Sequence, residues 1–204
     1  GKMGSGKTTA GNIVDGMEGE CMNVGIIGKM GSGKTTAANF LVEKYGFVKM
    51  GMADPIRLIV RDYFGIESKA DPRYRRLMQK VGTDWFRSAD PDVWVKYLLR
   101  SAEKENKPIV VDDVRFPNEA LALSCQGWKL VYLDCPYKLR ETRCRERDKQ
   151  FDHSTVNHPS ETGVDDILRL VGNGLPCGGS WIVADASRDA ESVNRAIEEL
   201  LFCT

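Results

Sequence analysis

The sequence predicts one α/β domain in which a parallel five-stranded sheet lies between two layers of helices. Short apolar runs alternate with longer segments of helical character, as in folds that cross from strand to strand through a helix. A chain of 204 residues is long enough for one sizeable core and short for two independent domains. A glycine-rich turn joins the first apolar run to the first helical segment, and no low-complexity linker divides the chain.

Five short apolar runs are predicted as the strands of this sheet. They are Val24–Ile27, Phe47–Met50, Ile109–Asp112, Lys129–Leu133 and Trp181–Ala184. Runs of this length, rich in β-branched residues and separated by helical segments, are typical of the buried strands of a parallel sheet. The result expected is a three-layer sandwich.

Seven segments are predicted as helices. They are Lys34–Tyr45, Pro55–Phe64, Asp71–Gly82, Pro91–Lys104, Pro117–Gln126, Tyr137–Asp148 and Arg188–Phe202. The stretch from Asp54 to Arg100 is longer than one crossover requires, so it is expected to form a helical insertion. The stretch Lys149–Glu161 is rich in turn-forming residues and is expected to be a mobile loop.

The first ten residues, GKMGSGKTTA, occur again as residues 28–37. The second copy follows the apolar run Met22–Ile27, whereas no strand is predicted before the first copy. The intervening GNIVDGMEGE is too glycine-rich and acidic for a good helix. We therefore expect residues 1–21 to be a disordered appendage, either a partial duplication or a gene-model artefact, and residues 22–204 to form the working domain.

Composition excludes several classes of function. The 29 basic and 29 acidic residues balance, which argues against a nucleic-acid polymer as partner. No apolar run is long enough to span a bilayer, and the start does not read as a signal peptide. The six cysteines are scattered and only two histidines are present, which disfavours a zinc site or a disulfide framework. A cytoplasmic protein without a membrane partner is expected.

The second copy of the repeat matches the phosphate-binding pattern G-x-x-x-x-G-K-[ST], with a strand before it and a helix after it. Its glycines let successive backbone N–H groups point at a polyphosphate, and the helix adds its positive dipole end. Lys34 is expected to reach the β- and γ-phosphates, and Thr35 to ligate Mg²⁺. The predicted cofactor-binding residues are Gly28, Lys29, Met30, Gly31, Ser32, Gly33, Lys34, Thr35 and Thr36.

Two carboxylates end the third apolar strand, within PIVVDDVRFPNEA. Asp112 and Asp113 point to opposite faces because side chains alternate along a strand, so at most one meets the magnesium. We assign Asp113 to this role with Thr35, and expect Arg115 on the same side to meet a phosphate. The alternative is an Asp–Arg pair that only shapes the turn before the Pro117 helix.

Arginines outside the loop separate kinases from hydrolytic switches. The guanine-binding Asn-Lys-x-Asp is missing, and the one Asp-x-x-Gly lies in a predicted helix, so a GTPase is excluded. Arg140, Arg143 and Arg147 share one helix face, which suits a lid over phosphates, although a solvated charged helix is the alternative. No general base stands out, and none is needed if the acceptor is an anionic phosphate monoester.

The blocks IIGKMGSGKTTAANFL, MADPIR, VGTDWFRSADPDVWV, VVDDVRFPNEA and HPSE resemble the phage-type deoxynucleoside monophosphate kinases. The resemblance implies a P-loop kinase fold and ATP- and Mg²⁺-dependent phosphoryl transfer to a deoxynucleoside 5′-monophosphate. It implies acceptor-binding roles for Asp54, Arg57, Arg87, Trp94 and Arg115. It implies lid roles for Arg140 and Arg143, and His158 and Glu161 would either contact the substrate or fix the loop. Adenine would rest near Asp185–Arg188.

Two other functions stay open at this stage. One is another P-loop small-molecule kinase, of the phosphomevalonate or dephospho-coenzyme A type, and the other is a P-loop module that hydrolyses ATP slowly. The expected partner is a small nucleotide, and a homodimer is possible. A phage-encoded enzyme of this kind would act in the host cytoplasm.

Overall fold

The computed structural model describes residues 22–68, 70–148, 159–172 and 179–202. The predictions for residues 1–21 and for His158 lie outside the described residues. Five parallel strands form one sheet in the order β2-β3-β1-β4-β5, which confirms the predicted fold class. The strands are β1 (Val24–Ile27), β2 (Val48–Met50), β3 (Ile109–Val114), β4 (Lys129–Asp134) and β5 (Trp181–Asp185).

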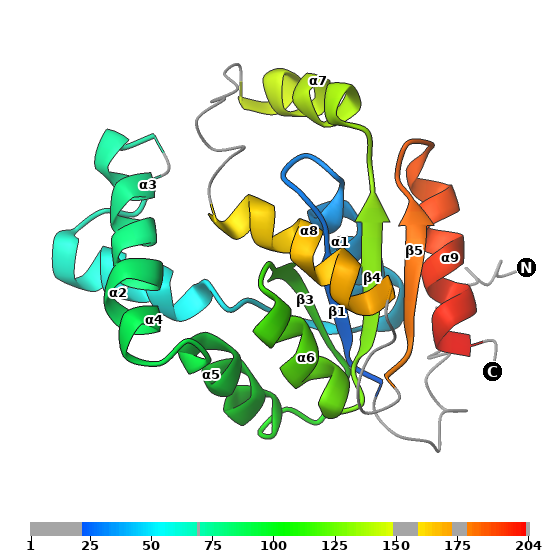
Figure 1. Ribbon diagram of the computed structural model, residues 1–204, viewed down its shortest axis with the longest axis horizontal. Coiled ribbons are helices and arrows are strands. Elements are labelled where there is room, and N and C mark those ends of the chain that lie inside the picture. Colours follow the sequence, from blue (N-terminus) through cyan, green and yellow to red (C-terminus); the bar gives the residue numbers. More distant parts are fainter. Residues whose placement is uncertain (1–21, 69, 149–158, 173–178, 203–204) are drawn as a thin grey trace, which may run out of the picture.

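Helices cover both faces of the sheet (Figure 1). On one face, α1 (Lys34–Tyr45) and α9 (Ala190–Phe202) share a core with alternate strand residues such as Val24 and Val110. On the other face, a second core contains α5 (Val93–Ala102), α6 (Pro117–Cys125) and α8 (Pro159–Gly172). β1 is buried along its whole length because both edges are paired and both faces are covered. The result is the predicted three-layer sandwich.

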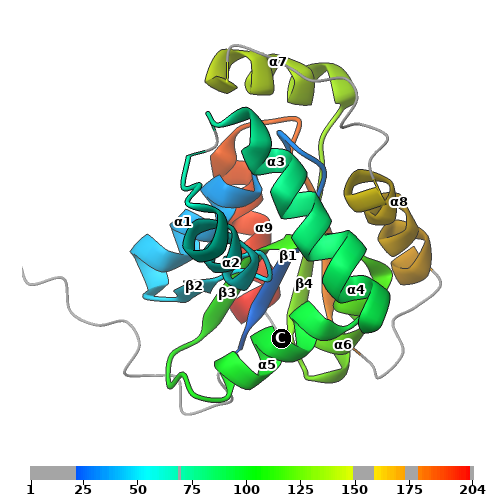
Figure 2. The same cartoon turned by 90° about the vertical axis from the view of Figure 1, so that its left-hand side faces the viewer.

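The predicted helical insertion stands at one side of the sheet (Figure 1) and faces the viewer in Figure 2. It contains α2 (Asp54–Phe64), α3 (Pro72–Gln79), a π-helical segment η2 (Lys80–Trp85) and α4 (Phe86–Ala89) before α5. The prediction of one helix over Asp71–Gly82 is therefore wrong at its end. There the buried Trp94 ring donates Nε1–H to the Gly82 carbonyl at 2.8 Å, so packing against α5 holds the wider π turn.

Two helices were not predicted, the short α4 (Phe86–Ala89) and α8 (Pro159–Gly172). The sequence was expected to form a loop up to Glu161, but α8 begins at Pro159. Proline is favourable in the first turn of a helix, where its missing N–H costs nothing, so the residue taken as a loop signal is a helix start. The buried positions that follow, Glu161, Val164, Ile167 and Val171, recur at helical spacing.

Helix α7 (Tyr137–Asp148), which was predicted as a lid, has the predicted bounds and lies beyond the carboxyl ends of the strands (Figure 1). Cys135 precedes this helix and Cys144 lies within it, and both side chains are buried. Cys125 is disulfide-bonded, which departs from the expectation of reduced cysteines. In the part of the chain that the structure describes, no helix combines the length and apolar character needed to cross a membrane.

Candidate active site

The glycine-rich loop between β1 and α1 is closely packed against α7. Gly31 and Gly33 have positive φ angles of 80° and 98°, in the left-handed region that glycine tolerates. A Cβ on Gly31 would lie 2.6 Å from the Arg140 carbonyl oxygen, so only glycine lets the loop approach α7 this closely. α1 begins at Lys34 without a side-chain cap, which leaves its first N–H groups available to an anion.

Lys34 is buried beneath this loop. Its Nζ donates to the carbonyl oxygens of Gly28 at 2.6 Å and Lys29 at 2.8 Å. Burial, and after it the positive charge of Arg115, lowers the pKa of Lys34 to about 7. Nearby carboxylates oppose this shift, foremost Glu161. The amine therefore lies at the loop with a proton affinity that a bound polyphosphate would raise.

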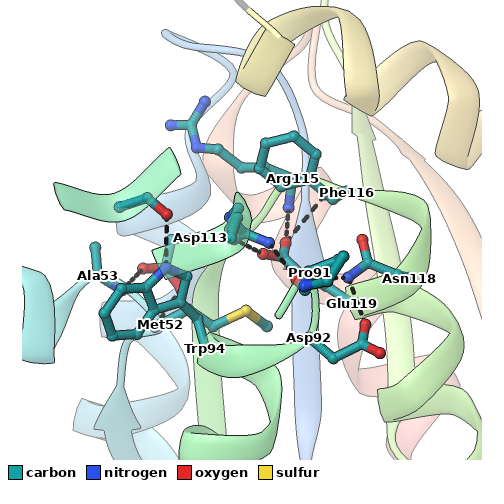
Figure 3. Close-up of polar contacts among 12 residues, drawn as sticks. Met52, Ala53, Pro91, Asp92, Trp94, Asp113, Arg115, Phe116, Asn118 and Glu119 are labelled. Carbon is teal, nitrogen blue, oxygen red and sulfur yellow. Dashed lines mark hydrogen bonds and ion pairs between the residues drawn. The ribbon is translucent and has the colours of Figure 1, made fainter. Parts of the chain in front are cut away.

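The two carboxylates at the end of β3 point to opposite faces, as expected, but it is Asp112 and not Asp113 that contacts Thr35. Asp112 accepts a hydrogen bond from Thr35 Oγ1 at 2.9 Å and from Lys49 Nζ at 2.7 Å. Asp113 turns toward the insertion and accepts from the backbone N–H groups of Met52 at 3.0 Å and Ala53 at 2.9 Å (Figure 3). The pairing of Asp113 with Thr35 is therefore wrong. Asp112 lies on the same face of the sheet as Val110, the face covered by α1. Asp113 lies on the opposite face with Val111.

A cavity of about 260 Å³ lies between the loop, β3 and the insertion; we call it the insertion cavity. Three arginines line it, Arg75, Arg87 and Arg115. Thioethers and one branched side chain form its apolar wall, Met30, Met52, Met78 and Ile56. Gln79 and Thr83 add polar groups. Five lining residues were singled out individually from the sequence: Met30, Arg87, Asp113, Arg115 and Glu161. Arg75, Met78 and Gln79 lie outside every sequence block quoted above.

Both predicted arginines of the insertion cavity are held by buried carboxylates. Arg87 forms an ion pair with Glu119, which is 1% exposed, and its Nη1 donates to the Pro91 carbonyl at 3.1 Å. Arg115 forms an ion pair with Glu161. Burial raises the pKa of Glu119, and the charge of Arg87 opposes that rise. These pairs fix two cations in the lining of the insertion cavity.

Helix α8 connects this wall to the loop. Glu161 also accepts the Met30 backbone N–H at 2.9 Å, and Asp165 pairs with Lys29 at 2.7 Å. A Cβ on Gly163 would lie 2.6 Å from the Arg115 carbonyl oxygen, so α8 packs tightly on the end of β3. The structure therefore gives Glu161 a direct part in the site, bridging the loop and Arg115.

The predicted lid arginines lie on the other side of the loop. Arg140 donates to the Cys135 carbonyl at 3.0 Å and to the Met30 carbonyl at 3.4 Å. Arg143 donates to the Ala186 carbonyl at 3.1 Å, within the loop between β5 and α9. Arg145 pairs with Glu141 at 2.7 Å, as its spacing predicts. Arg140 and Arg143 thus face the protein rather than a solvated surface.

Arg143 borders a second cavity of about 250 Å³ between the glycine-rich loop and α9, which we call the α9 cavity. Ala186 and Arg188 line it on the side where the sequence placed adenine. Three buried side-chain polar atoms of the described residues have no hydrogen-bond partner, and two of them, Ser32 Oγ and Asn194 Oδ1, belong to residues of this cavity. Such atoms favour a ligand that carries hydrogen-bonding groups.

Three predicted substrate-binding residues do not line the insertion cavity. Trp94 is 3% exposed and belongs to the core, where its indole contacts the Gly82 carbonyl. Asp54 accepts the Gly51 N–H at 2.7 Å and forms an ion pair with Arg57. Both side chains of that pair are about half exposed, 51% for Asp54 and 48% for Arg57. Their arrangement caps the turn before α2.

Residues 24–162 match the model of a protein family described as AAA domain. The chain belongs to this family. Within it, the glycine-rich loop of this AAA-domain protein is the P-loop. A mimivirus (Acanthamoeba polyphaga mimivirus) protein named as a deoxynucleotide monophosphate kinase is 28% identical, over 55% of this chain and 74% of the relative.

Solved structures with the same fold are P-loop kinases. Shikimate kinase from Acinetobacter baumannii, in complex with shikimate, superposes with a TM-score of 0.55 at 21% identity, over 88% of this chain and 92% of the other. Deoxyadenosine kinase from M. mycoides with bound dATP gives 0.54 at 13% identity, over 88% and 98%. At these identities the likeness establishes the fold of the AAA-domain protein, which is that of a P-loop kinase.

Proposed function

We propose that the protein transfers the γ-phosphate of ATP to the phosphate of a deoxynucleoside 5′-monophosphate, giving ADP and a deoxynucleoside diphosphate. The observation that carries this proposal is the insertion cavity, where Arg87 and Arg115 are fixed beside the P-loop residue Met30. Fixed arginines recognise phosphate through paired N–H groups. A phosphorylated acceptor placed there lies next to the γ-phosphate of a nucleotide on the P-loop.

The cavity favours a phosphate acceptor over a hydroxyl acceptor. A hydroxyl must lose a proton during transfer, so it needs a carboxylate that is free to accept one. Asp113 lines the cavity, but both of its oxygens already accept backbone N–H groups. A phosphate monoester is already anionic near neutral pH, with a second pKa of about 6. Positioning and charge neutralisation then suffice.

The rest of the cavity suits a nucleoside. Met30, Met52 and Met78 form a polarizable wall on which a flat base can pack, and Gln79 and Thr83 offer donors and acceptors for its edge. The name of the mimivirus relative supports the same substrate class. The α9 cavity, beside P-loop residues Ser32 and Thr36, is suited to the adenosine of the donor.

Thr35 and Asp112 fit a magnesium ion that is shared with a nucleotide. One hydroxyl and one carboxylate oxygen meet at 2.9 Å, and Mg²⁺ commonly takes few protein ligands and completes its shell with phosphate oxygens and water. Among the described residues, no group of three or more His, Cys, Asp or Glu side chains could hold a metal ion without further ligands. When bound there, the ion would neutralise charge on the β- and γ-phosphates.

The side chains then have separable tasks. Lys34 exchanges the Gly28 and Lys29 carbonyls for β- and γ-phosphate oxygens, and the P-loop N–H groups hold the same phosphates. Arg87 and Arg115 orient the acceptor phosphate in line with the γ-phosphate. Glu161 holds the Arg115 guanidinium and the Met30 N–H in a fixed position relative to one another.

The decisive experiment measures ADP release over a panel of acceptors. The panel contains deoxynucleoside monophosphates, ribonucleoside monophosphates, phosphomevalonate, dephospho-coenzyme A, gluconate and shikimate. Turnover that depends on a deoxynucleoside monophosphate is expected. Turnover with gluconate or shikimate alone would make the protein a hydroxyl-directed kinase, and phosphate release independent of every acceptor would make it an ATPase module.

ADP binding is expected to take up a proton near neutral pH. Because the pKa of Lys34 is about 7 in the free protein, many molecules carry a neutral amine there, and more do so as the pH rises. A bound polyphosphate stabilises the ammonium form, so binding raises that pKa and captures a proton. Affinity should fall by up to about tenfold per pH unit above about pH 7.

Calorimetric titrations in buffers of different ionisation heat measure this uptake directly. Lys34→Met should bind ADP more weakly and without the proton. Equal proton uptake by the wild type and Lys34→Met at pH 7.5 would assign the titration to another group.

A further inference from the structure

The segment Arg115–Glu119 forms one wall of the insertion cavity, and most of its side chains hold a neighbour in place (Figure 3). Asn118 Nδ2 donates to the Pro91 carbonyl at 3.1 Å and to Asp92 Oδ1 at 2.7 Å, which fixes the turn before α5. The Phe116 ring lies 4.3 Å from the Arg87 guanidinium carbon. These contacts converge on Arg87, which enters from a different element.

Glu119 is the centre of this arrangement. Its Oε2 accepts the backbone N–H groups of Arg115 at 2.7 Å and Phe116 at 3.0 Å, which satisfies donors at the start of α6. Its Oε1 is the atom that pairs with Arg87 Nη2. At 1% exposure the carboxylate is withdrawn from water, so these protein donors replace its hydration. One oxygen therefore serves the helix and the other serves the arginine.

Arg87 is correspondingly confined. The Glu119 carboxylate, the Pro91 carbonyl at 3.1 Å and the Phe116 ring hold its guanidinium on three sides. An arginine normally loses considerable rotamer freedom when it binds a phosphate. Here that freedom is already lost in the folded protein, so acceptor binding has a smaller entropic cost for ordering the Arg87 side chain.

We propose that Glu119 is a positioning residue for the acceptor site, which fixes the Arg87 guanidinium for the phosphate of the acceptor. The inference rests on the proposed function, because it takes the insertion cavity as the acceptor site. The residues FPNE then do more than shape the turn before α6. Phe116 and Asn118 support the arginine that Glu119 holds.

Glu119→Gln separates the two tasks of the carboxylate. The amide oxygen can still accept the Arg115 and Phe116 N–H groups, whereas the NH₂ group then meets Arg87 donor to donor. We expect the KM for the acceptor to rise about 10- to 100-fold, the effect of losing a charge-assisted hydrogen bond. The KM for ATP should stay within about twofold of the wild type, because Glu119 does not line the α9 cavity.

A double-mutant cycle with Arg87→Gln distinguishes positioning from general structure. If Glu119 acts through Arg87, Glu119→Gln adds little to the acceptor KM once Arg87 is replaced. If Glu119→Gln raises the acceptor KM by the same factor in both backgrounds, or raises both KM values equally, the proposal is overturned. Asp166→Asn breaks the exposed Arg169–Asp166 pair and serves as the control that should change neither KM.

A second variant tests the proposal if the first does not fold, and the activity of the wild type separates this proposal from the proposed function. If Glu119→Gln does not yield folded protein, Glu119→Asp keeps the charge but shortens its reach to Arg87; an unchanged acceptor KM in that variant would overturn the proposal. Wild-type protein without turnover of any deoxynucleoside monophosphate would instead refute the proposed function. The role of Glu119 is decided only by the KM comparison in active protein, so the two failures are distinct.

Discussion

Lys34→Met is expected to lower kcat by about 10²- to 10³-fold, the usual effect of removing one preorganised group that stabilises transition-state charge. Lys34 is the cation that lies beneath the P-loop, in contact with the Gly28 and Lys29 carbonyls. Methionine fills a similar volume but cannot neutralise the transferring phosphoryl group. A coupled ADP-release assay with saturating substrates measures the loss.

The chain supplies a matched control for this variant. Lys7 occupies the same position as Lys34 in the identical ten-residue segment at the start of the sequence. Lys7→Met is expected to leave kcat and both KM values unchanged. A comparable loss on replacing Lys7 would mean that the first copy takes part in the reaction, and full activity in Lys34→Met would remove the P-loop from it.

Stability measurements show whether loss of activity in Lys34→Met arises from unfolding. The folded pKa of Lys34, about 7, lies below its usual value of 10.5. The unfolded chain therefore binds more protons between these pH values, and wild-type stability rises with pH across that window. Below about pH 7 the full cost of burying the ammonium is present. Lys34→Met should raise Tm most at pH 6, and the gain should shrink toward pH 10.

Asp112→Asn is expected to lower kcat/KM by about 10²-fold and to raise the magnesium concentration needed for half-maximal activity. The Asp112 carboxylate contacts Thr35 Oγ1 at 2.9 Å, and an amide would be a weaker partner for a divalent cation. Activity titrated with magnesium at fixed nucleotide concentration provides the measurement.

Asp113→Asn is the neighbouring comparison with a different expected result. An asparagine side chain has one acceptor oxygen, so the Met52 and Ala53 N–H groups cannot both keep their present partners. We expect a loss of about 1–3 kcal/mol in the free energy of unfolding and an unchanged magnesium requirement. A higher magnesium requirement in Asp113→Asn than in Asp112→Asn would reverse our assignment of the two residues.

The P-loop could be predicted because the residues that form it are consecutive in the sequence. The glycines, Lys34 and Thr35 lie within one turn between a strand and a helix, so local sequence determines their geometry. The five strands were also predictable, since each is a short apolar run with a helical segment beside it. The apolar pattern could not show which residues of β3 face which layer of helices. Both of its faces are buried, so Val110 and Val111 look alike in sequence, and nothing indicates which side Asp112 takes.

The insertion cavity depends on tertiary packing that local patterns do not encode. Glu119 was missed because a glutamate in the first turn of a helix usually faces solvent; the proline at the start of α6 was the available signal. Trp94 was assigned to substrate through the family resemblance, and its place in the core could not be told from sequence because aromatic residues serve cores and bases equally well. Arg75 and Gln79 reach the cavity from α3, and Thr83 from the π-helical segment that follows it, for which the sequence has no simple signature.

Helix α8 touches both halves of the candidate active site, since Glu161 binds the Met30 N–H of the P-loop and the Arg115 side chain. Any shift of the P-loop on nucleotide binding therefore changes the surroundings of a cation in the insertion cavity. Donor and acceptor affinities are then thermodynamically linked, and the factor by which ATP alters acceptor binding must equal the factor by which the acceptor alters ATP binding. Under the proposed function, Glu161 would couple the donor and acceptor sites, because it contacts both the P-loop and Arg115.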